Sequence, residues 1–245
     1  MSTLAQRSWL IGISMLAVAG FSWPFFLPAI ASSSEFSSGW MAIAALPVLV
    51  IAALALLQGQ IAGPRQIAML AVLSSLAAAT RIATSGVGGF ELIFVVIILG
   101  SAAVGGSFGF LLGAFSILLS SLFFGGFGPW TAFQMFAVGW VGLGAGFLGS
   151  RITKHRLWLL AAYGFVASYG FGLVMNLWFW PFAVGPETSL SYRAGADLQE
   201  NLYSFLSYSL VSSTLTWDTL RALSTAAVIL LLGKPVLTTL ARYKA

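Results

Sequence analysis

The chain has 245 residues, of which 59% are hydrophobic and 7% are charged, and its mean hydropathy is +0.98. So few charged residues cannot cover a water-soluble globule of this length, so the composition predicts a protein that lies in a lipid bilayer. Cysteine is absent and His155 is the single histidine, which argues against disulfides, thiol chemistry and a zinc or redox centre. The net charge of +5 comes from basic residues at the ends of apolar runs, which is typical of membrane orientation and not of nucleic-acid binding.

The apolar segments predict an all-α polytopic membrane protein. Eight segments approach the roughly 20 residues that a helix needs to cross a bilayer. They are residues 8–28, 40–57, 66–83, 91–104, 106–124, 130–149, 157–180 and 203–232. The fourth segment is short and is joined to the fifth at Gly105-Gly106, so we expect these two to form a tight hairpin or a partly re-entrant pair.

The first segment has some features of a secretory signal peptide. Arg7 precedes the apolar run, and Ala29-Ile30-Ala31 follows it like a cleavage site. The run is about 22 residues long and contains Trp23-Pro24, whereas the core of a signal peptide is usually shorter. We therefore expect a retained membrane anchor.

The basic residues predict the orientation of the chain. With the N-terminus in the cytoplasm, eight of the eleven Lys and Arg residues fall on the cytoplasmic side, as the positive-inside rule requires. These eight are Arg7, Arg65, Arg151, Lys154, Arg156, Lys234, Arg242 and Lys244. The opposite side receives Glu35, Glu91, Glu187, Asp197 and Glu200. Eight crossings return the C-terminus to the cytoplasm, so we expect a multi-pass protein of the cell membrane with both termini inside.

Small residues recur at the spacing of helix interfaces. Ala71, Ser75 and Ala79 stand four residues apart on the third segment, and Gly142 and Gly146 do so on the sixth. This spacing lets another helix approach closely. It fits packing within the same bundle, and it also fits a docking face for a partner protein.

A glycine-proline turn with aromatic and amide neighbours precedes the sixth segment. The run 123–135 contains Trp130 and Gln134 directly after this turn. Irregular backbone survives at the rim of a membrane span only beside a cavity or water. The run therefore predicts a site for a small amphipathic ligand, and with it a membrane receptor or transporter.

A second aromatic and amide cluster lies at the outer end of the seventh segment and contains Asn176, Trp178 and Trp180. An aromatic belt at the lipid headgroups accounts for the tryptophans without a ligand, whereas a buried amide must find partners. The residues expected to line one ligand cavity are Trp130, Gln134, Asn176 and Trp178.

Three charged residues lie inside expected spans. Asp218 and Arg221 are three residues apart in the last segment, so their side chains share one helical face and can neutralise each other. The pair is either structural only or takes part in gating. Arg81 lies near the outer end of its segment, where it either reaches the membrane surface or binds an anionic group of a ligand.

Residues 66–232 resemble the substrate-binding membrane subunit, or S component, of energy-coupling factor (ECF) vitamin transporters. The resemblance is carried by three stretches: the Ala/Leu-rich span 67–79 ahead of Arg81, the helix 109–114 running into Gly125-Gly126-Phe127-Gly128-Pro129-Trp130, and the helix Gly142-Leu143-Gly144-Ala145-Gly146. It implies a six-helix substrate-binding domain at 61–245. An additional N-terminal transmembrane hairpin at 1–60 precedes it here.

The resemblance also implies a function. S components bind a vitamin from outside and dock onto a membrane coupling subunit that is driven by two ATPases, and no Walker-type loop occurs in this chain. The family's Ala-x-x-x-Ala docking stripe maps onto Ala71, Ser75 and Ala79, with serine at the centre. The candidate substrate-binding residues are Arg81, Trp130, Gln134, Asn176, Trp178 and Trp180. The Gly-Pro-Trp and Asn-Leu-Trp-Phe-Trp-Pro arrangement is most similar to the branch for cobalamin or its precursors, although a flavin or a benzimidazole would suit the tryptophans as well.

An ion-coupled secondary transporter and a membrane-embedded enzyme are the two rival classes of function. An ion-coupled secondary transporter of a small amphipathic molecule would need no ATPase, and Asp218 and Arg221 are its candidate midplane charges. An enzyme would need a catalytic set, and His155 lies in a basic loop far from the outer carboxylates, so no enzyme activity and no cofactor are expected.

Overall fold

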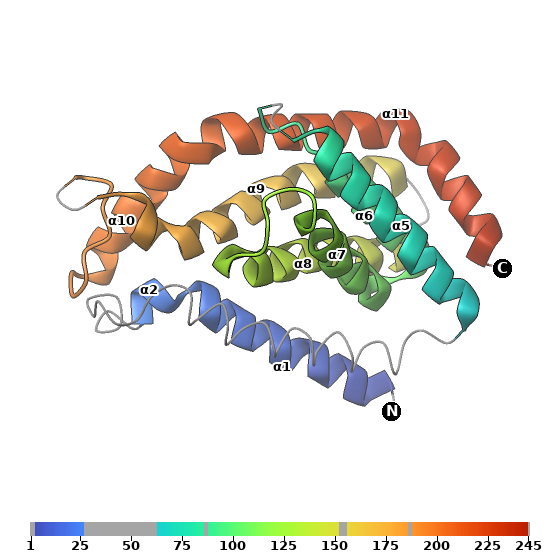
Figure 1. Cartoon of the computed structure of the whole chain (residues 1–245), viewed down its shortest axis with the longest axis horizontal. Helices are drawn as coiled ribbons and strands as arrows, with labels where there is room; N and C mark the ends of the chain where they lie inside the picture. Colours follow the sequence, from blue (N-terminus) through green and yellow to red (C-terminus); the bar gives the residue numbers. More distant parts are fainter. Residues whose placement is uncertain (1–2, 27–62, 86–87, 152–155, 186–187, 245) are drawn as a thin grey trace.

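The computed structural model describes residues 3–26, 63–85, 88–151, 156–185 and 188–244, and every regular element in these ranges is a helix (Figure 1). The helices are α1 Thr3–Phe21, α2 Trp23–Phe26, α5 Pro64–Ala83, α6 Ile93–Val104, α7 Gly106–Ser121, α8 Pro129–Arg151, α9 Arg156–Ala183, α10 Leu198–Ser209, the π-helix η1 Leu210–Asp218, and α11 Thr219–Lys244. The expected span 40–57, one arm of the expected hairpin, lies outside the described residues.

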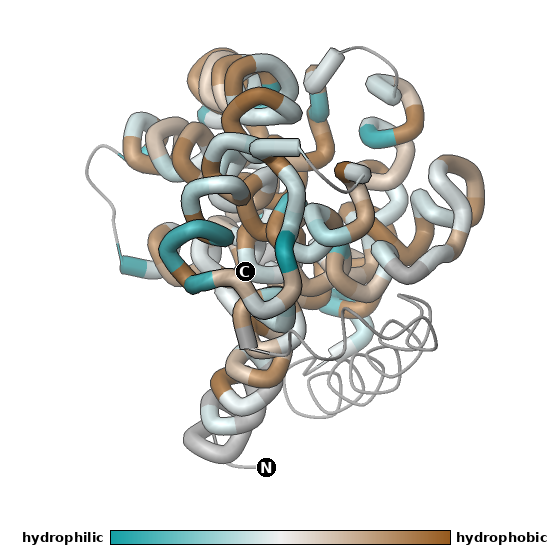
Figure 2. The backbone as a smooth tube through the Cα atoms, turned by 90° about the vertical axis from the view of Figure 1, so that its left-hand side faces the viewer, coloured by the Kyte–Doolittle hydropathy of each residue, from teal (hydrophilic) through white to brown (hydrophobic). Residues whose placement is uncertain are grey.

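Four of the described helices are long and apolar enough to cross a membrane. They are Pro64–Ala83, Trp130–Arg151, Arg156–Ala183 and Leu198–Arg242. Seen along the long axis, hydrophobic residues occupy every side of the bundle (Figure 2). The chain is therefore an all-α protein with several membrane-spanning helices, while the six-helix S-component arrangement stays a prediction.

The last helix is longer than the sequence predicts. The expected span 203–232 is part of a continuous helix, Leu198–Arg242, in which the nine residues of η1 have π-helical hydrogen bonding. Hydropathy ends a span where polar residues begin, but the helix continues through them, and it also continues past Pro235. The expected spans 91–104 and 106–124 become α6 and α7, which have 12 and 16 residues.

The middle of the bundle consists of α6, α7 and α8. Helix α5 packs against α6 and α7 on one side (Figure 1). On the other side α9 and α11 pack together, both contact α6, and α9 also contacts α8. The buried core comes largely from α6, α7 and α8; Phe94, Ile97, Leu111 and Leu112 are among its members that are nearly inaccessible to solvent. A smaller cluster of Trp180, Phe205 and Tyr208 joins α9 to α10.

Glycines allow α7 and α8 to pack with their backbones in contact. A Cβ atom on Gly142 would fall on the carbonyl oxygen of Gly109, and a Cβ on Gly146 would fall on the backbone of Gly105 and Gly106. The small residues of the sixth segment therefore serve packing within the bundle. Gly105, with φ of 144°, also makes the sharp turn between α6 and α7.

Replacing Gly142 with alanine should destabilise the protein. The added Cβ would meet backbone atoms of Gly109, which cannot move aside as a flexible side chain can, so α7 and α8 would have to separate. We expect a loss of about 1–3 kcal/mol, as for overpacking in a core. Gly170→Ala in α9 is the matched control, since a Cβ there meets nothing within 4 Å. Thermal unfolding in detergent measures both, and equal melting temperatures for Gly142→Ala and Gly170→Ala would contradict the close contact.

Candidate functional site

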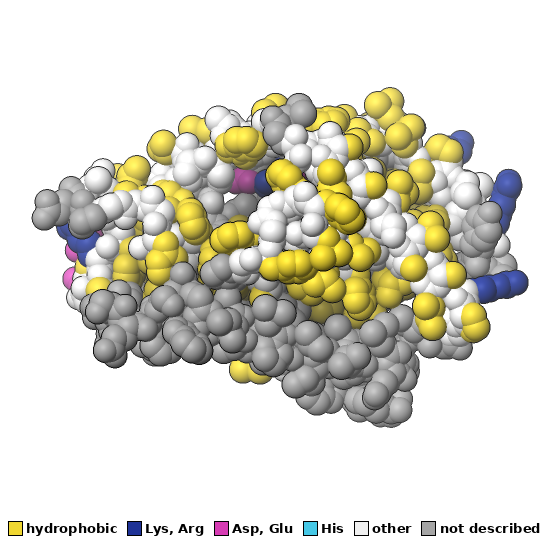
Figure 3. Space-filling view, in the orientation of Figure 1, with side chains coloured by type: hydrophobic (Ala, Val, Ile, Leu, Met, Phe, Trp, Pro, Cys, Tyr) yellow, Lys and Arg dark blue, Asp and Glu magenta, His cyan; other side chains and the backbone are white. Residues whose placement is uncertain are grey.

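A small cavity of about 160 Å³ lies where six helices and the segment before α6 meet. Four polar side chains line it, namely Arg81, Glu91, Gln134 and Arg221. The remaining wall is apolar and consists of Ile93, Phe94, Ile117, Val138, Phe171 and Met175. Figure 3 shows acidic and basic atoms together in a hollow of an otherwise largely apolar surface. Such a mixture of apolar wall and few convergent polar groups is typical of a small-molecule site.

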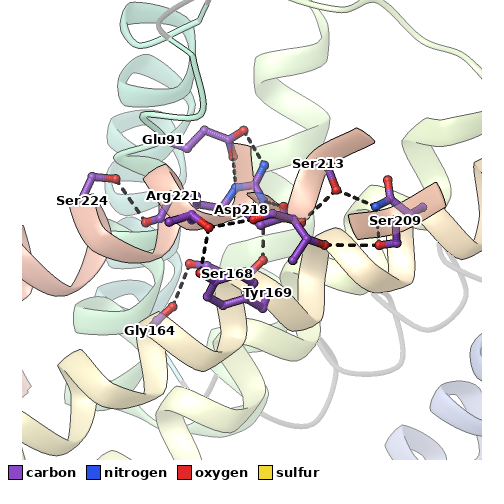
Figure 4. Close-up of polar contacts among 12 residues, drawn as sticks. Glu91, Gly164, Ser168, Tyr169, Ser209, Ser213, Asp218, Arg221 and Ser224 are labelled. Atoms are coloured by element: carbon purple, nitrogen blue, oxygen red, sulfur yellow. Dashed lines mark hydrogen bonds and ion pairs between the residues drawn. The ribbon is translucent and has the colours of Figure 1, made fainter. Parts of the chain in front are cut away.

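Arg221 of α11 is the centre of a buried ion cluster. Its Nη1 donates to Oδ1 of Asp218 at 2.6 Å, and its Nη2 and Nε donate to the two carboxylate oxygens of Glu91 at 3.0 and 3.1 Å (Figure 4). The Arg221 and Asp218 side chains are 7% and 2% exposed, whereas that of Glu91 is 31% exposed. The rings of Phe94 and Phe171 lie 5.6 and 5.0 Å from the guanidinium carbon and cover it.

The second oxygen of Asp218 has its own partners. Ser213 donates to Oδ2 at 2.9 Å, and the amide nitrogen of Asn176 donates to the hydroxyls of Ser213 and Ser209 at 2.6 and 2.9 Å. Ser213 and Asp218 are five residues apart, which is the spacing of bonded partners in a π-helix. η1 therefore brings this hydroxyl to the carboxylate. Gly172 of α9 completes the arrangement, because a Cβ there would fall on the Asp218 carboxylate.

Arg81 is held by neutral groups. Its Nη1 donates to the hydroxyl of Ser120 at 2.8 Å and its Nη2 to Oε1 of Gln134 at 3.2 Å. The ring of Phe124 lies 5.5 Å from its guanidinium carbon. Within the described ranges, Arg81 forms no ion pair. The cavity thus holds one neutralised cation, Arg221, and one cation without a bonded carboxylate.

The structure does not bring the four expected residues into one cavity. Only Gln134 lines the 160 Å³ cavity, together with Arg81. Trp130 lies on the surface with 39% exposure, because it begins α8 and folds back over Gly128. Trp178 is buried and packs against Phe133 at 5.0 Å between ring centroids.

Asn176 and Trp180 also have structural partners. Asn176 is occupied by the serines of α10 and η1. Trp180 is fully buried, and its Nε1 donates to the carbonyl of Leu190 at 2.7 Å, which fastens α9 to the loop that follows it. Neither side chain is part of the cavity wall.

The stripe on α5 faces outward. Ala71, Ser75 and Ala79 are exposed, whereas Leu73 and Ala77 on the same helix are buried against the bundle. The stripe therefore does not serve packing among the described helices.

Glu91 is the site residue that sequence reasoning missed. It was expected as an ordinary acidic residue of the outer side, and it instead neutralises Arg221. A signal was present, because Glu91 is the only acidic residue between Glu35 and Glu187 and stands directly before an apolar run.

A second cavity, of about 540 Å³, lies at the other end of α6. It is lined by Ala102 to Gly105, by the end of α8 and by Arg156. Arg156 donates a hydrogen bond to the carbonyl of Ala102, so a basic side chain meets the negative end of the α6 dipole.

No protein-family model matches this chain, and neither a curated protein nor a solved structure matches it.

Replacing Arg221 with methionine should destabilise the protein by about 3–5 kcal/mol, because Asp218 and Glu91 would remain without their cation. Asp218→Asn should cost less, because Glu91 still neutralises Arg221. Thermal unfolding in detergent would measure both. The control is Arg193→Met, which breaks a pair with Glu200 that is about half exposed and is worth about 0–1 kcal/mol. If Arg221→Met unfolds at the temperature of the control, the cluster does not stabilise the fold.

Proposed function

We propose that the protein is the substrate-binding membrane component of a transporter, of the ECF type that its sequence resembles, and that it captures a small ligand with an anionic group. The observation that carries this proposal is the position of Arg81 in the cavity wall without a bonded carboxylate. Its guanidinium lines the cavity, is oriented by Ser120 and Gln134, and has no ion-pair partner among the described carboxylates. A charged side chain at such a place marks a substrate path, and an anionic ligand would neutralise it.

The rest of the cavity wall supports an amphipathic ligand. Gln134 accepts from Arg81 through Oε1, so its amide nitrogen is available to donate to the same anionic group. Phe94, Phe171 and Met175 contribute an apolar surface to the same cavity. An aromatic or aliphatic body with one carboxylate or phosphate would satisfy both parts.

The size of the cavity restricts the ligand. About 160 Å³ is less than the roughly 300–1,000 Å³ of pockets for drug-sized molecules. A compact vitamin or vitamin precursor therefore suits the cavity better than cobalamin, whose corrinoid ring would need a much wider one. In this proposal the ligand is a small anion, in place of the expected corrinoid.

The exposed stripe of α5 supports a role for a partner. Ala71, Ser75 and Ala79 form a row of small residues beside the exposed Val72 and Leu76. A helix of a coupling subunit can approach closely along such a row. The proposed complex contains this chain, a membrane coupling subunit and two ATPases, with the termini of the chain on the cytoplasmic side.

One observation favours the ion-coupled alternative. Glu91 lines the cavity, is partly exposed, and is bonded to the buried Arg221–Asp218 pair. Carboxylates of this kind serve as proton or cation relays in secondary transporters. Uptake into vesicles that contain only this chain and a proton or sodium gradient would favour this alternative. Uptake that requires the coupling subunit and ATP would favour the ECF type.

The ligand can be identified as the small molecule that copurifies with the protein, by mass spectrometry after denaturation. Arg81→Gln should weaken its binding by about 10- to 150-fold, the range for a lost hydrogen bond to a charged group. Arg193→Gln, which removes a positive charge from the exposed pair with Glu200, is the control and should retain the ligand. Equal ligand content in Arg81→Gln and in the parent would contradict the proposal.

Replacing Ser75 with leucine tests the docking face separately. The bulkier side chain would project from the exposed stripe and obstruct a partner helix, while the cavity lies on the other side of α5. Uptake in cells should fall, and the copurified ligand should remain. Gly170→Leu on α9 provides a control for an added leucine. Loss of uptake and ligand together would mean that Ser75 serves the fold of this chain.

A further inference from the structure

A groove of about 770 Å³ lies between the start of α5 and the end of α11, far from the candidate ligand cavity along both helices. Helix α5 packs against α6 and α7, whereas α11 packs against α6 and α9, so the two helices diverge here. Both helix ends lie at the same end of the molecule in Figure 1, and Figure 3 shows basic side chains at that end. The groove thus opens at an end of the molecule that carries basic side chains.

The groove has an apolar part and a cationic part. Ala68, Met69, Val72, Leu73 and Leu240 form an apolar wall over about two turns of α5. Arg65 and Arg242 line the same groove, and both are exposed. Among the described residues neither arginine has a carboxylate partner. Two like charges at one groove repel each other, and an anion bound between them would offset this repulsion.

The geometry points to an anionic phospholipid as the occupant of this groove. Its phosphate would accept hydrogen bonds from the guanidinium groups of Arg65 and Arg242, which match phosphate oxygens in pairs. One acyl chain would lie along the apolar wall beside Val72, which is 66% exposed. Basic pockets between membrane helices bind anionic headgroups in this manner. The same arrangement disfavours a zwitterionic lipid, whose own cation would face the two arginines.

The test compares lipids bound to the full chain by native mass spectrometry in detergent. The parent should retain phosphatidylglycerol in preference to phosphatidylcholine. Arg65→Gln and Arg242→Gln should each reduce this preference by about fivefold, the ratio expected for the loss of one basic residue at a membrane surface. Lys234→Gln removes the same charge from an exposed position of α11 outside the groove, and it should leave the preference unchanged. Val72→Trp should fill the apolar wall and reduce binding of both lipids.

Several results would overturn the inference. They are equal retention of the two lipids by the parent, an equal effect of Lys234→Gln, and equal binding of glycerol phosphate, which has the headgroup anion but no acyl chain. A dimer in the same spectra that is lost in Val72→Trp would make the groove a contact between copies. If a glutamine variant does not fold, Arg65→Lys or Arg242→Lys replaces it. The lysine variant should show a preference between that of the parent and none.

Discussion

The burial of Arg221 constrains the rest of the structure. A guanidinium in the interior of a membrane bundle is tolerable only when its charge is neutralised and its donors are occupied. Two carboxylates do this, one from its own helix and one, Glu91, from the distant start of α6. The long final helix is thereby fastened to the central helices. η1 and Gly172 follow from the same requirement, because they bring Ser213 and the backbone of α9 close to Asp218.

Much of this architecture can be predicted from the sequence, because hydropathy and helix period are local properties. The apolar runs indicate helices, and the spacing of Asp218 and Arg221 predicts that they face each other, as their 2.6 Å contact reflects. The third partner, Glu91, is 130 residues away in sequence, and no local pattern predicts such a contact. The π-helix η1 is not indicated by the sequence either, because Asn176, which bonds to its Ser213, belongs to a different helix. The sequence also does not separate the roles of the tryptophans, because a tryptophan at the end of a span has the same sequence context whether it is exposed, as Trp130 is, or buried in the core, as Trp178 is.

Arg81 and Arg221 line the same cavity but have different roles. Arg221 donates hydrogen bonds from all three of its guanidinium nitrogens to carboxylates, and it is part of the scaffold. Arg81 is positioned by a hydroxyl and an amide, which orient a guanidinium without cancelling its charge. Among the described residues Arg81 has no carboxylate within bonding distance, so in the proposed function its guanidinium is the group that binds an anion.

The short helix α6 contributes residues to both the 160 Å³ cavity and the 540 Å³ cavity. Ile93 lines the small cavity and Ala102 lines the larger one, nine residues further along the same helix. Nine residues rise about 14 Å along a helix, less than half of the roughly 30 Å hydrocarbon core of a bilayer. The two cavities are therefore much closer to each other along α6 than the two faces of a bilayer are.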